Sequence, residues 1–544
     1  MSTQVPPCPT AAAGAQRRVR VIAATLALAA STFASAQLTD ITQTKPNVPL
    51  GAIAKSLQQQ VGAGRGDEAT PGSSLYLIAR DPARAVRRGR QLFQRKFTME
   101  QGLGPRLNFN SSGDIMVTPQ LGAGAGDSCA ACHGRPRGSA GFGGDVVSRP
   151  DSRSSPHLFG IGIREMLADE MTHDLRAVRQ FDAVLAAMIG APVALPLASK
   201  GISFGWIKAL PDGTFDTSLV QGVNADLRVR PFFADGREFS LRAFAITAFN
   251  DELGMQAADP VVCAASDPTH AVAVTTPGGL VLDPALDTIG RPATCSATDD
   301  VDHDLVTNEI DPALIDYMET YLLNYFRPGT GKETARSAQG RALMDSSGCT
   351  SCHVADFTVD HDRRVADVDV RYDETRGTFN HLFATARTLF TTIHDGAAYP
   401  KLVPTRDSFV VHDLFTDFKR HDLGAQFAER NYDGTLHTMF MTTALWGVGT
   451  KSPYGHDGRS ANLEEVILRH GGEAQPSRDA FAALDDDSRH QLIEFLQTLV
   501  LFPPDDTASN LNAGVPGSAR PQDPTQHGSI ALSALFQIPS EGAE

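Results

Sequence analysis

Cysteine and tryptophan are scarce in this chain of 544 residues, which contains seven cysteines and two tryptophans. Seven cysteines are too few for a disulfide scaffold, and a chain of this length can bury sizeable hydrophobic cores without one. Basic residues are also in deficit, with 48 Lys and Arg against 63 Asp and Glu and a net charge of −15. This charge argues against nucleic acid or an anionic membrane surface as the main partner.

Long hydrophobic runs are lacking as well, because no apolar stretch reaches the ~20 residues of a transmembrane helix. A shorter apolar run, residues 21–30, follows three arginines and precedes the small-x-small sequence Ala-Ser-Ala at residues 34–36. This pattern predicts a Sec-type bacterial signal over residues 1–36. We therefore expect a periplasmic or secreted protein without a transmembrane anchor.

Four cysteines lie in two copies of the pattern C-x-x-C-H. The first copy comprises Cys129, Cys132 and His133, and the second comprises Cys349, Cys352 and His353. In this pattern two thiols bond to the vinyl groups of a haem, and the adjacent imidazole becomes an axial ligand of the iron. A zinc site would need four converging ligands, and a thioredoxin-like site would need a βαβ context. The sequence therefore predicts two covalently attached haem c groups.

Two further cysteines, Cys263 and Cys295, remain once the predicted signal and the haem motifs are set aside. In an oxidising compartment an even remainder most simply forms a disulfide, which here would close a small insertion. Two free buried thiols are the alternative.

An internal repeat surrounds the two haem motifs. The phrase G-R-x-L-apolar begins at Gly89 and again at Gly340, before each motif. The phrase D-G-R-x-x-(S/N)-L begins at Asp235 and again at Asp457, after each motif. The second phrase is typical of a turn followed by a capped amphipathic helix. We infer two related haem domains in tandem.

The haem motifs and three phrases resemble the diheme cytochrome c peroxidase superfamily, and most of all its diheme thiol-oxidoreductase-like group. The phrases are LRVRPFFADGREFSLRAF, FNDELGM and ALWGVGTKSPYGHDGRSANLEEVILRHGGEA. The superfamily includes the methylamine-utilisation diheme enzyme and the diheme rubber and fatty-acid oxygenases. The resemblance covers roughly residues 87–501. It implies two cytochrome domains in electron-transfer contact, one with a reactive haem and one whose haem relays electrons.

The expected fold is mostly α, with two tandem cytochrome c-like haem domains, long loops and the small disulfide-closed insertion. The predicted parts are a signal peptide at 1–36, a polar arm at 37–80, a reactive-haem domain at 81–308, an electron-transfer domain at 309–502 and a Pro- and Gly-rich tail at 503–544. Within the first domain, residues 158–222 contain apolar runs punctuated by Gly and Pro. We expect them to form loops over the first haem.

The resemblance also implies a sixth ligand for the second haem. In the superfamily this ligand lies fourteen residues beyond the residue that precedes the D-G turn. Counting from His456 gives His470. His353 and His470 would then form a bis-histidine iron site, which suits electron transfer.

The same count in the first domain, from Ala234, reaches Ala248, whose side chain cannot coordinate a metal. The haem held by His133 is therefore expected to keep an open face for peroxide or dioxygen. The alternative is that another histidine, such as His157 or His173, occupies that position.

Two residues are candidates for the open face. The superfamily peroxidases carry a distal glutamate in the phrase N-P-x-E-M, and the matching phrase here makes Glu252 the acid–base residue. The proline is missing and the preceding segment is two residues shorter, so a surface charge on a helix is the alternative. Phe249 would lie over the haem, as an aromatic does in rubber oxygenases, or belong to the core.

Alternating aspartates at 300, 302 and 304 resemble the start of a calcium loop. Leu305 occupies the position where such a loop requires glycine, so a solvated acidic loop is the favoured interpretation. Calcium is kept as a hypothesis for an additional cofactor.

We predict an exported diheme c-type oxidoreductase of peroxidase type, which takes electrons from a small redox protein and acts on peroxide at the first haem. One alternative is a dioxygenase acting on an unsaturated fatty acid or polyisoprene, and another is an electron carrier without enzymatic activity. A carrier would saturate both irons, so Ala248 favours an enzyme. Glu252 favours peroxide over dioxygen.

Overall fold

The computed structural model describes most of the chain after residue 55. The described ranges are 56–104, 127–133, 154–269, 272–301, 304–374, 382–430, 434–501, 510–512 and 530–531. The predicted signal, the first part of the arm and nearly all of the tail lie outside the described residues. Among the helices that the structure describes, none has the length and apolar character needed to cross a membrane.

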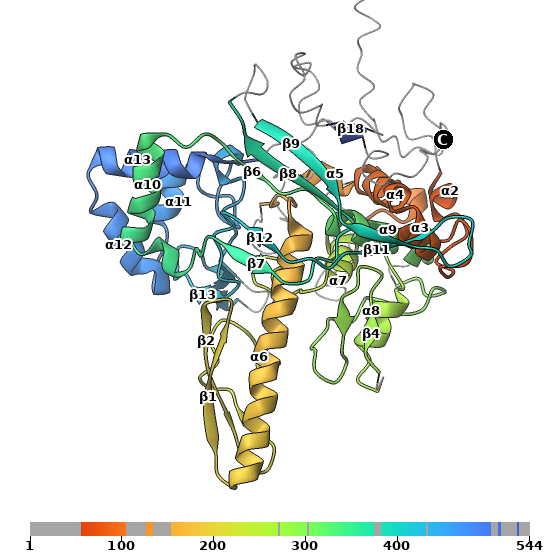
Figure 1. The fold of residues 1–544 in the computed structure, drawn as a ribbon, viewed down its shortest axis with the longest axis horizontal. Helices are drawn as coiled ribbons and strands as arrows, with labels where there is room; N and C mark the ends of the chain where they lie inside the picture. Colours follow the sequence, from red (N-terminus) through yellow and green to blue (C-terminus); the bar gives the residue numbers. More distant parts are fainter. Residues whose placement is uncertain are drawn as a thin grey trace, which may run out of the picture.

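Helices form two clusters, which lie at opposite sides of the view in Figure 1. The first cluster contains α2 (Leu57–Val61), α3 (Ser74–Arg80), α4 (Pro82–Gln94), α7 (Leu241–Ala248) and α9 (Pro312–Leu323). The second contains α10 (Ala335–Ser346), α11 (Leu463–Leu468), α12 (Gln475–Ala482) and α13 (Asp486–Gln497). Shorter helical turns are α5 (Cys129–His133), α8 (Pro260–Ala265), η1 (Met99–Gln101), η2 (Phe249–Leu253), η3 (Cys349–Ser351), η4 (Val448–Thr450) and η5 (Gly472–Ala474).

The repeated G-R-x-L phrase marks the same close helix crossing in both clusters. In the first cluster α4 packs on α9, where a Cβ added to Gly89 would lie 2.0 Å from the carbonyl oxygen of Tyr317. In the second, α10 packs on α13, where a Cβ on Gly340 would lie 1.9 Å from the carbonyl oxygen of Gln491. Only glycine allows the backbones to approach this closely. The internal repeat therefore has a packing cause.

The two D-G-R turns also share one conformation. Each is closed by an antiparallel backbone pair, Phe232 with Glu238 in the first and Tyr454 with Ser460 in the second. Gly236 and Gly458 have φ angles of +63° and +64°, which favour glycine. The side chains of Ser240 and Asn462 then accept backbone N–H groups at the starts of α7 and α11. The predicted turn and capped helix are confirmed in both copies.

Strands are more abundant than the mostly α prediction implied, with 36% helix and 17% strand. One sheet has the order β17 (Leu499–Val500), β6 (Gly329–Thr330), β8 (Ala366–Tyr372) and β9 (Leu382–Thr388). Two-stranded pairs are β4 (Val274–Thr275) with β5 (Val281–Leu282), β7 (Phe357–Val359) with β12 (Phe409–Val411), β10 (Phe390–Ile393) with β11 (Lys401–Pro404), β13 (Arg420–Asp422) with β16 (Met439–Met441), β14 (Glu429–Arg430) with β15 (Leu436–His437), and β18 (Asn510–Asn512) with β19 (Ile530–Ala531). The mostly α prediction is therefore only partly confirmed.

The loops predicted over residues 158–222 are instead a long helix and a hairpin that project from the body in Figure 1. The helix is α6 (Ile161–Ile189), and the sheet contains β1 (Val193–Ser199), β2 (Ile202–Ala209) and β3 (Phe215–Asp216). Gly160 and Gly190 adopt left-handed conformations at the two ends of α6. These glycines therefore mark helix ends rather than a loop.

The predicted disulfide between Cys263 and Cys295 is confirmed, with the two Cα atoms 5.7 Å apart. It joins α8 to a loop beyond β5 and so closes the predicted small insertion. A fully buried arginine, Arg242 on α7, holds this region to the first helical cluster through ion pairs with Asp259, Asp316 and Glu319. A buried guanidinium with three carboxylate partners is fully compensated.

The close crossing of α10 and α13 predicts the effect of Gly340→Ala. We expect a loss of about 1–3 kcal/mol in the free energy of unfolding, because the added methyl overlaps the Gln491 carbonyl and forces the helices apart. Denaturant unfolding followed by circular dichroism measures this change. Gly331→Ala is the matched control, since its Cβ would lie 3.4 Å from its nearest neighbour. Equal stability of both variants would contradict the packing argument.

Candidate functional site

The first haem motif forms α5 and lies against a hydrophobic cluster. Cys129 packs against this cluster, which contains Leu92 and Phe93, and burial raises the pKa of its thiol to about 12. His133 Nδ1 donates a hydrogen bond to the carbonyl oxygen of Pro156 at 2.7 Å. Burial lowers the pKa of His133 to about 4, so the imidazole is neutral and its Nε2 carries the lone pair that a metal requires.

The second motif has the same arrangement at η3. His353 Nδ1 donates to the carbonyl oxygen of Phe415 at 3.0 Å, and burial lowers the pKa of this histidine to about 4. Both motif histidines are therefore neutral and held by a backbone carbonyl through the nitrogen that does not face a metal. This orientation is what axial ligation of a haem iron needs.

His470 lies just beyond the end of α11. Its Nδ1 donates to the carbonyl oxygen of Val466 at 2.9 Å, which leaves Nε2 as the acceptor nitrogen. Burial lowers the pKa of His470, and a charge on His470 would in turn lower the pKa of His353. The structure thus brings the two predicted ligands within electrostatic reach of each other. Their joint coordination of one iron stays a prediction.

The two histidines considered as alternative ligands of the first haem differ in position. Burial lowers the pKa of His157 to about 3, and a charge on His133 adds to this effect. His157 therefore lies near His133. Its Nε2 donates to the carbonyl oxygen of Trp446 at 2.5 Å, and among the described residues its buried Nδ1 has no partner. His173 is exposed on α6. Only His157 is therefore placed near the first motif.

Two cations near the first motif fit a haem. Loss of surrounding water lowers the pKa of Lys451 to about 8 and that of Arg164 to about 10. Both cations also lower the pKa of His157, which places them close to it. In the part of the chain that the structure describes, no carboxylate contributes to the pKa of either cation. Arg164 donates a hydrogen bond to the carbonyl oxygen of Pro231 and lies over the ring of Phe232. A desolvated cation is costly unless an anion compensates it, and the two propionates of a haem are such anions.

Lys451 and Arg164 would therefore hold the haem propionates, while His133 would hold the iron and Cys129 and Cys132 the porphyrin edge. Sequence reasoning missed both cations because a single Lys or Arg carries no pattern. Lys451 does lie in the phrase ALWGVGTKSPYGHDGRSANLEEVILRHGGEA that carries the family resemblance, but that phrase does not single it out. The buried environment, and not the residue type, identifies the two side chains.

The predicted open-face residues lie in η2, a π-helical turn directly after Ala248. Phe249 is buried, and its ring meets that of Phe97 edge-on at 6.0 Å. The Phe97 backbone N–H donates to the carbonyl oxygen of Asp127, two residues before the first haem motif. Phe249 therefore lies in the hydrophobic cluster that supports this motif, and its position over the haem stays a prediction. Glu252 is partly exposed in the same turn, and its role stays a prediction.

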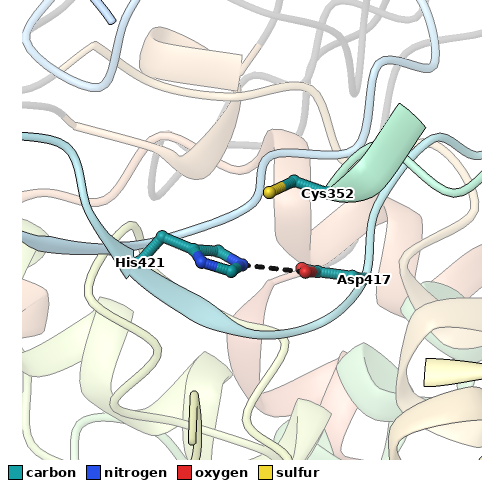
Figure 2. Close-up of side chains that lie close together, drawn as sticks. All are labelled: Cys352, Asp417 and His421. Atoms are coloured by element: carbon teal, nitrogen blue, oxygen red, sulfur yellow. Dashed lines mark hydrogen bonds and ion pairs between the residues drawn. The ribbon is translucent and has the colours of Figure 1, made fainter. Parts of the chain in front are cut away.

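Cys352 of the second motif forms a compact group with Asp417 and His421, as Figure 2 shows. His421 Nε2 bonds Asp417 at 2.8 Å, and its Nδ1 bonds Glu473 at 2.7 Å. Burial opposes a charge on His421, but the bonds to Asp417, Cys352 and Glu473 outweigh it and raise the pKa to about 11. An imidazolium has no lone pair for a metal. The group therefore supplies a fixed positive charge between two carboxylates.

The aspartate loop keeps part of a calcium-loop geometry. The carboxylate of Asp300 accepts the backbone N–H groups of Asp304 and Leu305, both at 3.0 Å. Leu305 has a φ of +73°, so it adopts the left-handed conformation that glycine normally supplies at this position. Asp302 lies outside the described residues, and a calcium site here stays a prediction.

Residues 385–499 match the model of a protein family described as "Di-haem oxidoreductase, putative peroxidase". No curated protein matches the chain. The matched segment contains His421, Trp446, Lys451 and His470 but neither C-x-x-C-H motif. It covers much of the predicted second domain and supports a di-haem oxidoreductase of peroxidase type.

The uncompensated charge of Lys451 predicts the effect of Lys451→Met on the first haem. A nearby positive charge stabilises the reduced iron. We therefore expect its loss to lower the midpoint reduction potential of this haem by on the order of tens of millivolts. Spectroelectrochemical titration measures the potential of each haem. Lys208→Met removes an exposed lysine on β2 and serves as the control. An unchanged potential in Lys451→Met would remove this residue from the propionate site.

Proposed function

We propose that this protein is an exported diheme c-type oxidoreductase that reduces peroxide at its first haem and takes electrons through its second. The observation that carries this proposal is an asymmetry between two equivalent positions. The D-G-R turns have the same conformation, yet the residue fourteen positions beyond Ala234 is Ala248, while the residue fourteen beyond His456 is His470. One haem would keep an exchangeable face, and the other would not.

The second haem would be held between His353 and His470. Each ring is oriented by a backbone carbonyl, so neither needs to reorganise when the iron changes oxidation state. The His421 imidazolium would lie between two carboxylates, Asp417 and Glu473, so these three groups together would carry one net negative charge beside Cys352. Saturated axial ligation and a rigid surround are what an electron-transfer site requires.

At the first haem the iron, when bound, supplies the redox chemistry and the binding position for peroxide. The protein would contribute a proton carrier in Glu252, which lies one helical turn from the buried ring of Phe249. Phe249 and Phe97 would exclude water from that face. A carboxylate at such a boundary can take a proton from peroxide and return it to the leaving oxygen.

The electron donor would be a small redox protein with a basic surface. The chain carries a net charge of −15, and opposite charge accelerates the encounter of redox partners. The disulfide between Cys263 and Cys295 supports an oxidising compartment outside the cytoplasm, in keeping with the predicted signal at residues 1–36.

A dioxygenase acting on an unsaturated fatty acid or polyisoprene is the second candidate. The buried position of Phe249 favours it, because an apolar wall at the reactive face suits a hydrocarbon substrate. The partly exposed Glu252 favours peroxide. An electron carrier without a substrate would be expected to have two axial ligands on each iron, and Ala248 cannot supply one.

The bis-histidine assignment predicts that His470→Ala converts one haem from low spin to high spin, because the iron loses a strong-field ligand. The other haem should bind cyanide or peroxide as before. Electron paramagnetic resonance and visible spectra of the oxidised protein measure both effects. His490→Ala, at an exposed histidine on α13, is the control. An unchanged spectrum in His470→Ala would exclude this residue as a ligand.

The proton-carrier role predicts that Glu252→Gln slows peroxide turnover by a factor on the order of 10²–10⁴. The assay supplies hydrogen peroxide and a reduced carrier to the purified protein, and a parallel assay supplies oleate and air without reductant. Asp212→Gln, at an exposed turn carboxylate, is the control. Full turnover by Glu252→Gln would make this residue structural, whereas oxygenated oleate formed without reductant would replace the peroxidase with the dioxygenase.

A further inference from the structure

The projecting arm formed by α6 and its hairpin carries an unusual amount of exposed apolar surface. Of the 17 large hydrophobic side chains that are exposed in the described residues, seven lie between residues 181 and 219. They are Phe181, Val184, Met188, Ile189, Trp206, Phe215 and Leu219. A concentration of this kind usually marks an interaction site on a soluble domain.

The exposed residues on α6 follow a spacing that identifies the type of partner. Ala177, Phe181, Val184 and Met188 are separated by four, three and four residues, which is the a/d spacing of a helix that pairs with another helix. All four are exposed, with Phe181 at 62% and Met188 at 77%. We call these four residues the α6 seam.

The other side of the helix is already occupied. Ile202, Phe204 and Ile207 of β2 are buried in the hydrophobic cluster that includes α6, and the Asp182 carboxylate accepts the backbone N–H of Ala209 at 3.0 Å. The hairpin therefore covers one face of α6 and leaves the α6 seam to solvent. The seam lies on the solvent-facing side of a helix whose opposite side is packed.

The distribution of charged residues along α6 indicates what kind of partner fits the seam. Along the seam, residues 177–188, the charged residues are Arg179, whose guanidinium lies over the Phe215 ring at 5.8 Å, and Asp182, whose side chain is buried. None of the four seam positions is charged. A partner helix therefore needs no charged residues opposite the seam. The α6 seam of a second copy meets this requirement, since a two-fold axis places the same apolar positions opposite each other.

We propose that two copies of this chain pair through their α6 seams in an antiparallel arrangement, with Phe181 of each copy facing Val184 of the other. Ala177 would then face Met188. The pairing extends over about three helical turns and needs no rearrangement of the helix or of the hairpin.

A lipid surface is a poorer occupant for this arm. Asp216 of β3 lies opposite Lys208 of β2, and Asp212 lies in the turn between these two strands. Both carboxylates are therefore at the end of the hairpin that lies near the C-terminus of α6. Hydrogen bonds from Thr214 and Ser218 lower the pKa of Asp212 and Asp216 respectively, so both remain ionised. Hydrocarbon disfavours such groups, whereas the rim of a protein interface accommodates them.

The length of the arm also removes the main obstacle to pairing, which is repulsion between two acidic bodies. The helix α6 has 29 residues, and its outer half extends on the order of 20 Å at 1.5 Å per residue. This is more than two Debye lengths at physiological salt, where the screening distance is about 8 Å. Contact at the arms therefore leaves the charged bodies largely screened from each other.

Analytical ultracentrifugation of the haem-loaded mature protein tests the proposal. We expect a concentration-dependent dimer, and we expect Val184→Glu to raise its dissociation constant at least tenfold because a charge enters the centre of the seam. Gln180→Glu adds the same charge outside the seam and should leave the dimer intact. Circular dichroism and haem spectra of both variants check that they are folded.

A second measurement uses the antiparallel geometry. The double variant Ala177→Cys, Met188→Cys should form an intermolecular disulfide under mild oxidation, whereas Gln180→Cys alone should form little. A wild-type protein that stays monomeric at about 100 μM, or a Val184→Glu dimer as strong as that of the wild type, would overturn the proposal. Binding of wild-type monomers to phosphatidylcholine vesicles that is lost in Val184→Glu would overturn it in favour of a lipid surface.

Discussion

The hydrogen bond from an imidazole Nδ1 to a backbone carbonyl is the interaction on which both candidate sites depend. His133, His353 and His470 each donate such a bond, to Pro156, Phe415 and Val466 respectively. The bond fixes the tautomer and the direction of Nε2, so each ring is prepared for a metal by the main chain and not by another side chain. Under the proposed function, the surrounding loops and helices would act by positioning these three carbonyl groups.

The architecture also repeats a small set of structural features. A glycine at each helix crossing and a glycine in each D-G-R turn reproduce the same two features in both copies. The segments between them differ, because the first copy carries α6 and its hairpin and the second carries the strands β7 to β16. The contrast between Ala248 and His470 is a further difference. Under the proposed function, a duplicated pair of helix crossing and turn would let two haems take different chemical roles through the residues placed beside each.

The sequence predicted the features that depend on local patterns. The repeat glycines Gly89 and Gly340, the capped turns and the Cys263–Cys295 disulfide follow from spacing and residue type alone. The helix α6 was missed because its bounding glycines were interpreted as loop punctuation. Lys451 and Arg164 could not have been found, because an uncompensated charge is a property of the three-dimensional surroundings and leaves no trace in the order of residues.

The two uncompensated cations near His133 also bear on how the protein matures. Among the described residues neither Lys451 nor Arg164 has a carboxylate partner, although Arg164 donates to the carbonyl oxygen of Pro231, so an anionic group would lower the cost of their desolvation. Attachment of the prosthetic group would relieve this penalty at the moment the thioether bonds form. Under the proposed function, chains without the prosthetic group would keep this cost and be less stable than chains that carry it.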